Sequence, residues 1–128
     1  MTQRRLQLGE SGEAIAARAL RRAGYTILAE RYTCPVGELD LVAKDGDTVV
    51  FVEVNTRPSA DRYPPGEAVH IRKQRKVARV AEYFLASANV GAVPCRFDVV
   101  AITVPEDGGP PRVEVIRDAF PAEGIEVF

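Results

Sequence analysis

Two runs of apolar residues near the middle of the chain are separated by a short polar turn. Leu39 to Ala43 and Val49 to Val54 lie on either side of Lys44-Asp45-Gly46-Asp47. An Asp-Gly step between β-branched runs is a strong local signal for a hairpin. The pattern therefore predicts two antiparallel strands within residues 37–57.

Apolar residues that recur every three or four positions predict one helix before this hairpin and one after it. The first spans residues 10–23 and ends at Gly24, with Glu13 on its apolar stripe. The second spans about residues 67–88. Lys73 lies one turn before the apolar stripe of this second helix and in phase with it. We therefore expect Lys73 to point towards the sheet.

Three further strands are predicted at residues 25–32, 95–104 and 113–117. The Pro- and Gly-rich stretch at residues 58–66 predicts a loop. The order of one helix, three strands, one helix and two strands predicts an α/β fold with a mixed central β-sheet flanked by helices. We expect one domain over residues 1–120 and a loose C-terminal tail over residues 121–128.

The composition is that of an ordinary globular protein, with 46% hydrophobic and 27% charged residues and a formal net charge of −1. No apolar run is long enough to span a membrane and no hydrophobic signal region begins the chain, so we expect a cytoplasmic protein with no membrane contact. With so little net charge, attraction to nucleic acid must come from local basic clusters. Cys34 and Cys95 are expected to stay reduced, and the single histidine, His70, excludes a catalytic histidine pair.

Acidic residues interrupt both strands of the central hairpin. Asp40 and Glu53 stand where a core strand would carry apolar side chains. Because side chains alternate along a strand, a suitable register brings Asp40, Glu53 and Asn55 to one surface. Two such carboxylates repel each other unless a cation compensates them, and Mg²⁺ commonly binds one or two carboxylates together with water and phosphate. A solvated sheet face with no ligand fits the same spacing.

Other charged residues have a structural or a binding interpretation. We interpret Asp98 as structural, tied to Arg96 or to a helix end. Arg57 could contact a phosphate oxygen bidentately. The second helix carries a basic edge made of Arg72, Arg75, Lys76 and Arg79. This edge is either a solvated face or a nucleic-acid contact.

Several of these positions belong to longer motifs. The hairpin carries Gly37-Glu38-Leu39-Asp40 and Phe51-Val52-Glu53-Val54-Asn55-Thr56-Arg57, and the rest of the chain carries Gly9-Glu10-Ser11-Gly12-Glu13, Lys73 and Arg96-Phe97-Asp98. In these motifs the chain resembles the YraN family of small bacterial proteins, which is related to archaeal Holliday-junction resolvases. The resemblance covers about residues 9–104. It implies the PD-(D/E)xK nuclease fold, with a restriction-endonuclease-like core.

The resemblance implies metal-dependent hydrolysis of DNA phosphodiesters, with branched DNA as a candidate substrate. The metal, Mg²⁺ or Mn²⁺, would be held by Asp40, Glu53 and the backbone carbonyl of Val54, with Glu13 contributing directly or through water. Such a metal polarises the phosphoryl oxygen and activates the attacking water. The resemblance favours DNA over RNA as the partner and is compatible with a homodimer, since the related resolvases act as dimers.

Asn55 departs from the resembled family, whose pattern has a lysine two residues after the glutamate. Asparagine can orient a water, but it cannot neutralise an anion. Either another cation reaches the same place, Lys73 in preference to Arg57, or the chain keeps the fold without cleavage, as a nucleic-acid-binding module or a domain that recruits a partner. An introduced, inactivating substitution is a third interpretation. The candidate catalytic residues are Glu13, Asp40, Glu53, Asn55 and Lys73.

Overall fold

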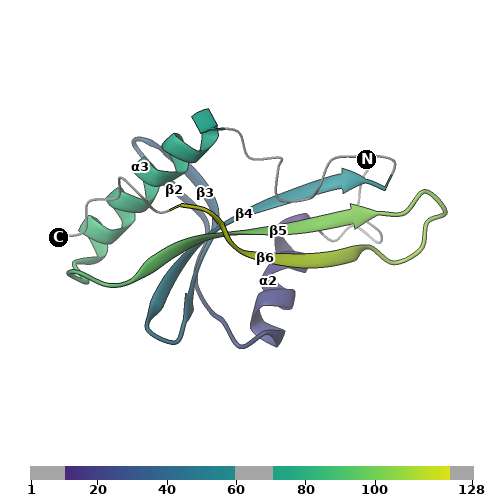
Figure 1. Ribbon diagram of the computed structural model, residues 1–128, viewed down its shortest axis with the longest axis horizontal. Coiled ribbons are helices and arrows are strands. Elements are labelled where there is room, and N and C mark those ends of the chain that lie inside the picture. The colour runs from purple at the N-terminus through teal and green to yellow at the C-terminus, as the bar shows by residue number, and fades with distance from the viewer. Residues whose placement is uncertain (1–10, 60–70, 122–128) are drawn as a thin grey trace.

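The computed structural model describes residues 11–59 and 71–121. These residues form, in chain order, α2 (Gly12–Arg22), β2 (Thr26–Cys34), β3 (Gly37–Asp45), β4 (Thr48–Pro58), α3 (Ile71–Ala88), β5 (Cys95–Val104) and β6 (Arg112–Phe120) (Figure 1). The predicted α/β class and the predicted order of elements are confirmed. The predicted helix start before residue 71, most of the predicted loop, His70 and the tail beyond residue 121 lie outside the described residues.

The strands form one mixed sheet in the order β2-β3-β4-β5-β6. All neighbours are antiparallel except β4 and β5, which run parallel from Val49 and Cys95 to Pro58 and Val104. A parallel pair needs a crossover connection, and α3 lies within this one. The ladder between β4 and β5 continues past Glu53 and Asn55, so it holds the candidate residues of β4 in a fixed place.

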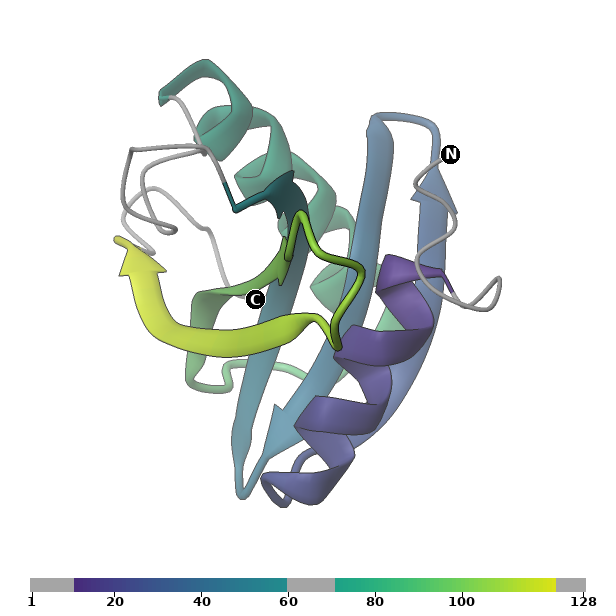
Figure 2. The same ribbon diagram turned by 90° about the vertical axis from the view of Figure 1, so that its right-hand side faces the viewer.

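The two helices cover opposite faces of the sheet (Figure 2). α2 buries its apolar stripe, which consists of Ile15, Ala16, Ala17 and Leu20, over Val50 and Val52 of β4. On the other face, α3 buries Val77, Val80, Ala81 and Leu85 over Phe51 and Phe97. Because successive side chains of a strand point to opposite faces, β4 supplies both apolar layers.

Local signals explain where α2 begins and ends. The Ser11 side chain caps the N-terminus by accepting a hydrogen bond of 3.1 Å from the Ala14 N–H. Gly24 follows the helix with a φ of 97°, a left-handed conformation that favours glycine. The predicted end of this helix at Gly24 is confirmed.

The strands extend beyond the apolar runs that predicted them. β3 and β4 pair as far as Asp45 and Thr48, and Gly46 takes the positive φ of 62° that this tight turn requires. β6 runs to Phe120 and passes through an irregularity in its ladder to β5, where Asp118 has a φ of 55°. The Asp98 carboxylate accepts a hydrogen bond of 2.9 Å from the Asp118 N–H at this point. A polar side chain thus replaces a regular ladder bond, which apolar patterning does not reveal.

Asp98 is fully buried and belongs to a polar network that joins three strands to the start of β2. Arg96 donates to both oxygens of Asp98, and the Tyr25 hydroxyl donates to Asp98 over 2.9 Å. Arg96 also pairs with Asp45, and so does Arg117. Burial acts to lower the pKa of Arg96, but its bonds to Asp98 and Asp45 outweigh this effect and raise it. The predicted structural tie between Asp98 and Arg96 is confirmed.

Two smaller expectations concern thiols and membranes. Cys34 and Cys95 are both free thiols, as predicted. Among the described helices, none is long and apolar enough to cross a membrane.

Candidate active site

The candidate site forms where β3 separates from β4. The ladder between these strands ends at the pair Leu41 and Val52, one position before Asp40 and Glu53. Beyond this pair, the Asp40 carboxylate accepts a hydrogen bond of 2.7 Å from the Val54 N–H. The carboxylate therefore takes over the role of a ladder acceptor, and the register places Asp40 beside Glu53.

Asp40 is a perturbed acid. Its pKa rises from 3.8 to about 6 because the carboxyl group is partly buried and because Glu53, and to a lesser extent Glu13, place negative charge near it. The hydrogen bond from Val54 and the charge of Lys73 act in the opposite direction. Three acids from one helix and two strands thus influence one position, as the sequence pattern predicts. Perturbed acids of this kind are concentrated at functional sites.

Glu53 faces α3 and is paired with Lys73. The Lys73 Nζ lies 2.9 Å from Glu53 Oε1, although the lysine side chain is 58% exposed and the glutamate side chain only 7%. The hydrogen bond to Glu53 raises the pKa of Lys73. The predicted direction of Lys73, towards the sheet, is therefore correct. Its ammonium group lies beside Glu53, two residues before Asn55, the position at which the resembled family has a lysine.

Glu13 is paired with Arg31, a residue that the sequence did not single out. Arg31 Nη2 lies 3.0 Å from Glu13 Oε1, and the bond to Glu13 raises the pKa of Arg31. Arg31 has a φ of 53°, and the pairs Glu30–Leu41 and Tyr32–Leu39 place it opposite Asp40. The register across two strands would have indicated this residue, but register is not visible in a local pattern.

A small cavity lies beside Glu13 and Asp40 on the α2 side of the sheet. Its volume is about 210 Å³, and it is lined by Ser11, Gly12, Glu13, Arg31, Asp40, Val54 and Thr56. The Arg31 guanidinium group and the Thr56 hydroxyl group can donate hydrogen bonds to a phosphate group there, whereas the carboxylates of Glu13 and Asp40 would repel it unless a cation lay between them. Thr56 is a second residue that sequence reasoning did not assign to the site.

Asn55 carries an unsatisfied donor. Its Nδ2 atom is buried and has no hydrogen-bond partner among the residues that the structure describes. Alternation along β4 places Asn55 on the Glu53 side of the sheet. A buried donor without a partner costs about 1 to 3 kcal/mol. An unsatisfied amide at this motif position is what a site for a water or a ligand oxygen would require.

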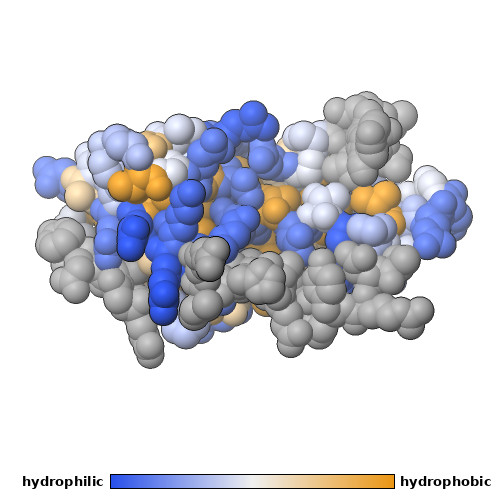
Figure 3. Space-filling model, turned by 90° about the horizontal axis from the view of Figure 1, so that it is seen from above, coloured by the Kyte–Doolittle hydropathy of each residue, from blue (hydrophilic) through white to orange (hydrophobic). Residues whose placement is uncertain are grey.

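The candidate nucleic-acid-binding residues occupy different environments. Arg57 continues β4 and is half-buried, whereas Lys76 and Arg79 are exposed on α3. A Cβ atom built on Gly37 would lie 3.2 Å from Lys76 Cε, so Lys76 extends over the start of β3. The Arg72 side chain lies outside the described residues. Seen from above, this part of the molecule is largely hydrophilic, with smaller hydrophobic areas (Figure 3).

The acids do not form a ready-made metal cage. Among the described residues, no group of three or more His, Cys, Asp or Glu side chains is arranged to hold a metal ion. Glu13 and Glu53 each bind a basic side chain instead. The groups best placed to bind a metal ion are the adjacent acids Asp40 and Glu53, together with the backbone of Val54, which follows Glu53 on β4.

The fold and the site define an α/β protein whose mixed sheet carries two adjacent carboxylates beside a helix lysine. The sequence profile of the Uncharacterised protein family UPF0102 matches residues 12–102 of the chain. The chain belongs to this family, which is the YraN family that its motifs resemble.

Similar proteins occur in several bacteria. A UPF0102 protein of Moorella thermoacetica is 44% identical over 120 residues, which is 94% of this chain and 100% of the relative. One of Syntrophus aciditrophicus is 44% identical over 121 residues, covering 94% and 92% of the two chains. One of Symbiobacterium thermophilum is 45% identical over 116 residues, covering 91% and 98%. The similarity therefore extends over nearly the whole of each chain.

The raised pKa of Asp40 predicts a pH-dependent gain from Asp40→Asn. In the folded protein this acid ionises near pH 6 rather than 3.8, so its charge lowers stability increasingly as the pH rises from about 4 to above 6. Asparagine removes the charge and keeps an acceptor for the Val54 N–H. We expect a gain of about 1 to 2 kcal/mol at pH 8, allowing for solvent screening of this partly exposed group, and almost none at pH 4.

Urea denaturation of the metal-free protein at both pH values measures this effect. Asp47→Asn, which changes an exposed carboxylate in the β3–β4 turn, is the matched control and should shift stability by less than about 0.5 kcal/mol. A gain from Asp40→Asn that is the same at pH 4 and pH 8 would contradict the electrostatic origin.

Proposed function

We propose that this protein is a metal-dependent endonuclease that hydrolyses DNA phosphodiesters on a restriction-endonuclease-like core. The observation that carries the proposal is the adjacency of Asp40 and Glu53, with the Lys73 ammonium group 2.9 Å from Glu53. Two adjacent acids could hold a divalent cation that activates water, and a lysine beside them could balance charge that develops on the phosphate. Family membership supports the motif assignment, and the catalytic roles are our inference.

The donor set fits Mg²⁺ or Mn²⁺. Hard divalent cations take one or two carboxylates together with water and substrate phosphate, and Asp40 and Glu53 supply two carboxylates whose repulsion a cation would relieve. The Val54 carbonyl would be a third donor, and Glu13 a fourth once it exchanges Arg31 for the ion. When bound, the cation would polarise the phosphoryl oxygen and favour ionisation of the attacking water.

The protein's own residues would do the rest of the work. Lys73 supplies the positive charge that the motif lysine supplies in the resembled family, where this chain has Asn55. The unsatisfied amide of Asn55 can donate to the attacking water or to a phosphate oxygen. Arg31 would turn from Glu13 towards the phosphate and balance its charge. Lys73 would thus supply the charge and Asn55 the orienting hydrogen bond, two roles that a single lysine combines in the resembled family.

The substrate contacts would extend from the site along β4 and α3. Arg57, Arg72, Lys76 and Arg79 would bind phosphates of the DNA on either side of the cleaved bond. Branched DNA and a homodimer on a two-fold substrate follow from the same resemblance, and action on DNA implies a cytoplasmic protein.

Cleavage assays test this function directly. We expect Mg²⁺- or Mn²⁺-dependent nicking of duplex or four-way-junction DNA by the wild-type chain, lost in Asp40→Ala. Asp47→Ala is the matched control because this acid is exposed and lies at the other end of the hairpin. Absence of metal-dependent cleavage of duplex, single-stranded and junction DNA by both the wild type and Asn55→Lys would reject the enzyme.

A catalytically silent nucleic-acid-binding module is the second candidate. The favouring observation is that Glu13 and Glu53 already have basic partners within the protein, Arg31 and Lys73. This candidate predicts salt-sensitive DNA binding that is weakened by Lys76→Ala and Arg79→Ala, with no turnover at any metal concentration. Binding that is equal in dilute and physiological salt would exclude it.

A further inference from the structure

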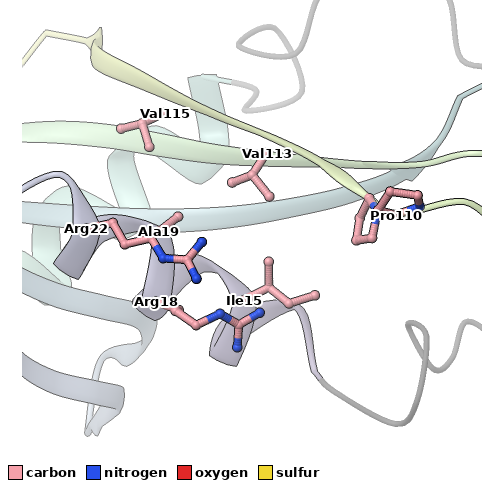
Figure 4. A pocket seen from close by; sticks show the side chains of 8 residues that line it. Ile15, Arg18, Ala19, Arg22, Pro110, Val113 and Val115 are labelled. Atoms are coloured by element: carbon pink, nitrogen blue, oxygen red, sulfur yellow. The ribbon is translucent and has the colours of Figure 1, made fainter.

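A groove lies on the α2 face of the sheet, between α2 and the hairpin formed by β5 and β6. Only the N-terminal end of α2 also lines the active-site cavity. The volume of the groove is about 490 Å³. Ile15 from the helix and Val113, Val115 and Pro110 from the hairpin form its apolar walls (Figure 4). Val113 is 38% exposed, so its side chain is accessible from the groove. This surface has no part in the proposed chemistry.

Two arginines border the same groove. Arg18 and Arg22 lie one turn apart on α2, so their side chains extend from the same side of the helix over the groove (Figure 4). Among the described residues that line the groove, none is acidic. The groove therefore combines an aliphatic floor with two arginine side chains on one wall. Arginine binds carboxylates bidentately, which gives such a wall a preference for Asp, Glu or a terminal carboxylate.

The strand beside the groove can also accept a partner. β6 is the last strand of the sheet within the described residues, and Arg112, Val113 and Glu114 at its start are exposed. An extended peptide can add to such an edge through main-chain hydrogen bonds, and its alternate side chains then enter the adjoining pocket. A strand added to β6 would place every second side chain beside Val113 and Val115.

We propose that this groove binds an extended segment of another protein that combines aliphatic side chains with at least one carboxylate. The aliphatic side chains would pack on Val113 and Val115, and the carboxylate would pair with Arg18 and Arg22. The proposal concerns protein recruitment and does not depend on the proposed nuclease activity.

Two other occupants fit the groove less well. Antiparallel pairing of β6 with β6 of a second copy would keep both α2 helices on one face and bring Arg18 and Arg22 near their own copies, so like charges would oppose it. Single-stranded nucleic acid is usually bound by aromatic rings on which bases stack. No aromatic residue is among the described residues that line the groove.

Selection from a random twelve-residue peptide display library on the immobilised full chain tests the proposal. We expect enriched peptides to combine aliphatic residues with Asp or Glu. Synthetic fluorescent copies should bind at least ten-fold more weakly to Val113→Lys and to the double variant Arg18→Glu/Arg22→Glu, as measured by anisotropy. Leu28→Lys is the matched control, since Leu28 is a comparably exposed aliphatic residue (45% against 38%) on β2, the opposite edge strand among the described residues. It should bind as the wild type does.

Each other outcome would overturn the proposal. These outcomes are no enrichment over the uncoated support, enriched peptides without acidic residues, and unchanged binding to the Val113 and arginine variants. A dimer in sedimentation that Val113→Lys dissociates would identify a second copy as the occupant. Duplex or single-stranded DNA binding that Arg18→Glu/Arg22→Glu abolishes and Val113→Lys retains would identify nucleic acid. Melting temperatures of the variants within a few degrees of the wild type establish that lost binding is not lost folding.

Discussion

Replacing Asp98 by alanine is expected to lower the free energy of unfolding by about 3 to 5 kcal/mol, a large part of the stability of a chain of this size. The substitution removes the buried acceptor of Arg96, of the Tyr25 hydroxyl and of the Asp118 N–H at once. It leaves a guanidinium group that is only 16% exposed with one acidic partner, Asp45, of the two it had. Urea denaturation followed by circular dichroism measures the loss.

Arg117→Ala is the matched control for this network. Arg117 also pairs with Asp45, but its side chain is 62% exposed, and an exposed ion pair contributes less than about 1 kcal/mol. A loss of less than about 1 kcal/mol for Asp98→Ala would show that Asp98 can be removed without leaving its partners unsatisfied.

If the protein is the nuclease we propose, Lys73→Ala is expected to reduce the rate of DNA cleavage by about 100- to 1000-fold, the effect of removing one preorganised charge from a hydrolytic site. The ammonium group contacts Glu53 and lowers the pKa of Asp40, so its loss also leaves the two acids less compensated. The loss should appear in kcat more than in KM, because the lysine would act on charge that develops during the reaction. Single-turnover cleavage of a labelled duplex or junction measures it.

Two companion variants distinguish catalysis from general attraction to DNA. The double variant Lys73→Ala/Asn55→Lys returns a lysine to the motif position and should recover much of the activity, whereas Asn55→Lys alone should raise it. Arg75→Ala removes an exposed charge from the same helix and should change the salt dependence with little effect on kcat. Cleavage by Lys73→Ala at the wild-type rate would show that another cation supplies the catalytic charge.

The fold was largely predictable because its main signals are local. The apolar runs at residues 39–43 and 49–54, with the Asp-Gly turn between them, predicted the central hairpin, and helical phase alone separated Lys73 from its basic neighbours. The structure confirms both and places Lys73 on Glu53. The position of Glu13 on the α2 stripe likewise anticipated its place at the cavity that Asp40 lines.

The partners of the candidate residues could not be predicted in the same way. Arg31 reaches Glu13 because β2 takes a left-handed residue opposite Asp40, and neither the strand register nor that conformation has a local signature. Tyr25 bonds to Asp98, which is 73 positions away in the sequence, and Asp45 bonds to Arg96, which is 51 positions away. Sequence periodicity reports which face a side chain occupies, but it does not report what lies across from it.

The hydrogen bond from the Val54 N–H to Asp40 has a consequence for how this family can change over time. A single carboxylate completes the backbone pairing of two strands and, in the proposed function, would also bind the cation. Selection for shape and selection for chemistry therefore act on the same atoms. A lineage that lost the reaction would still need an acceptor for the Val54 N–H at this position, and asparagine would supply that acceptor without the charge.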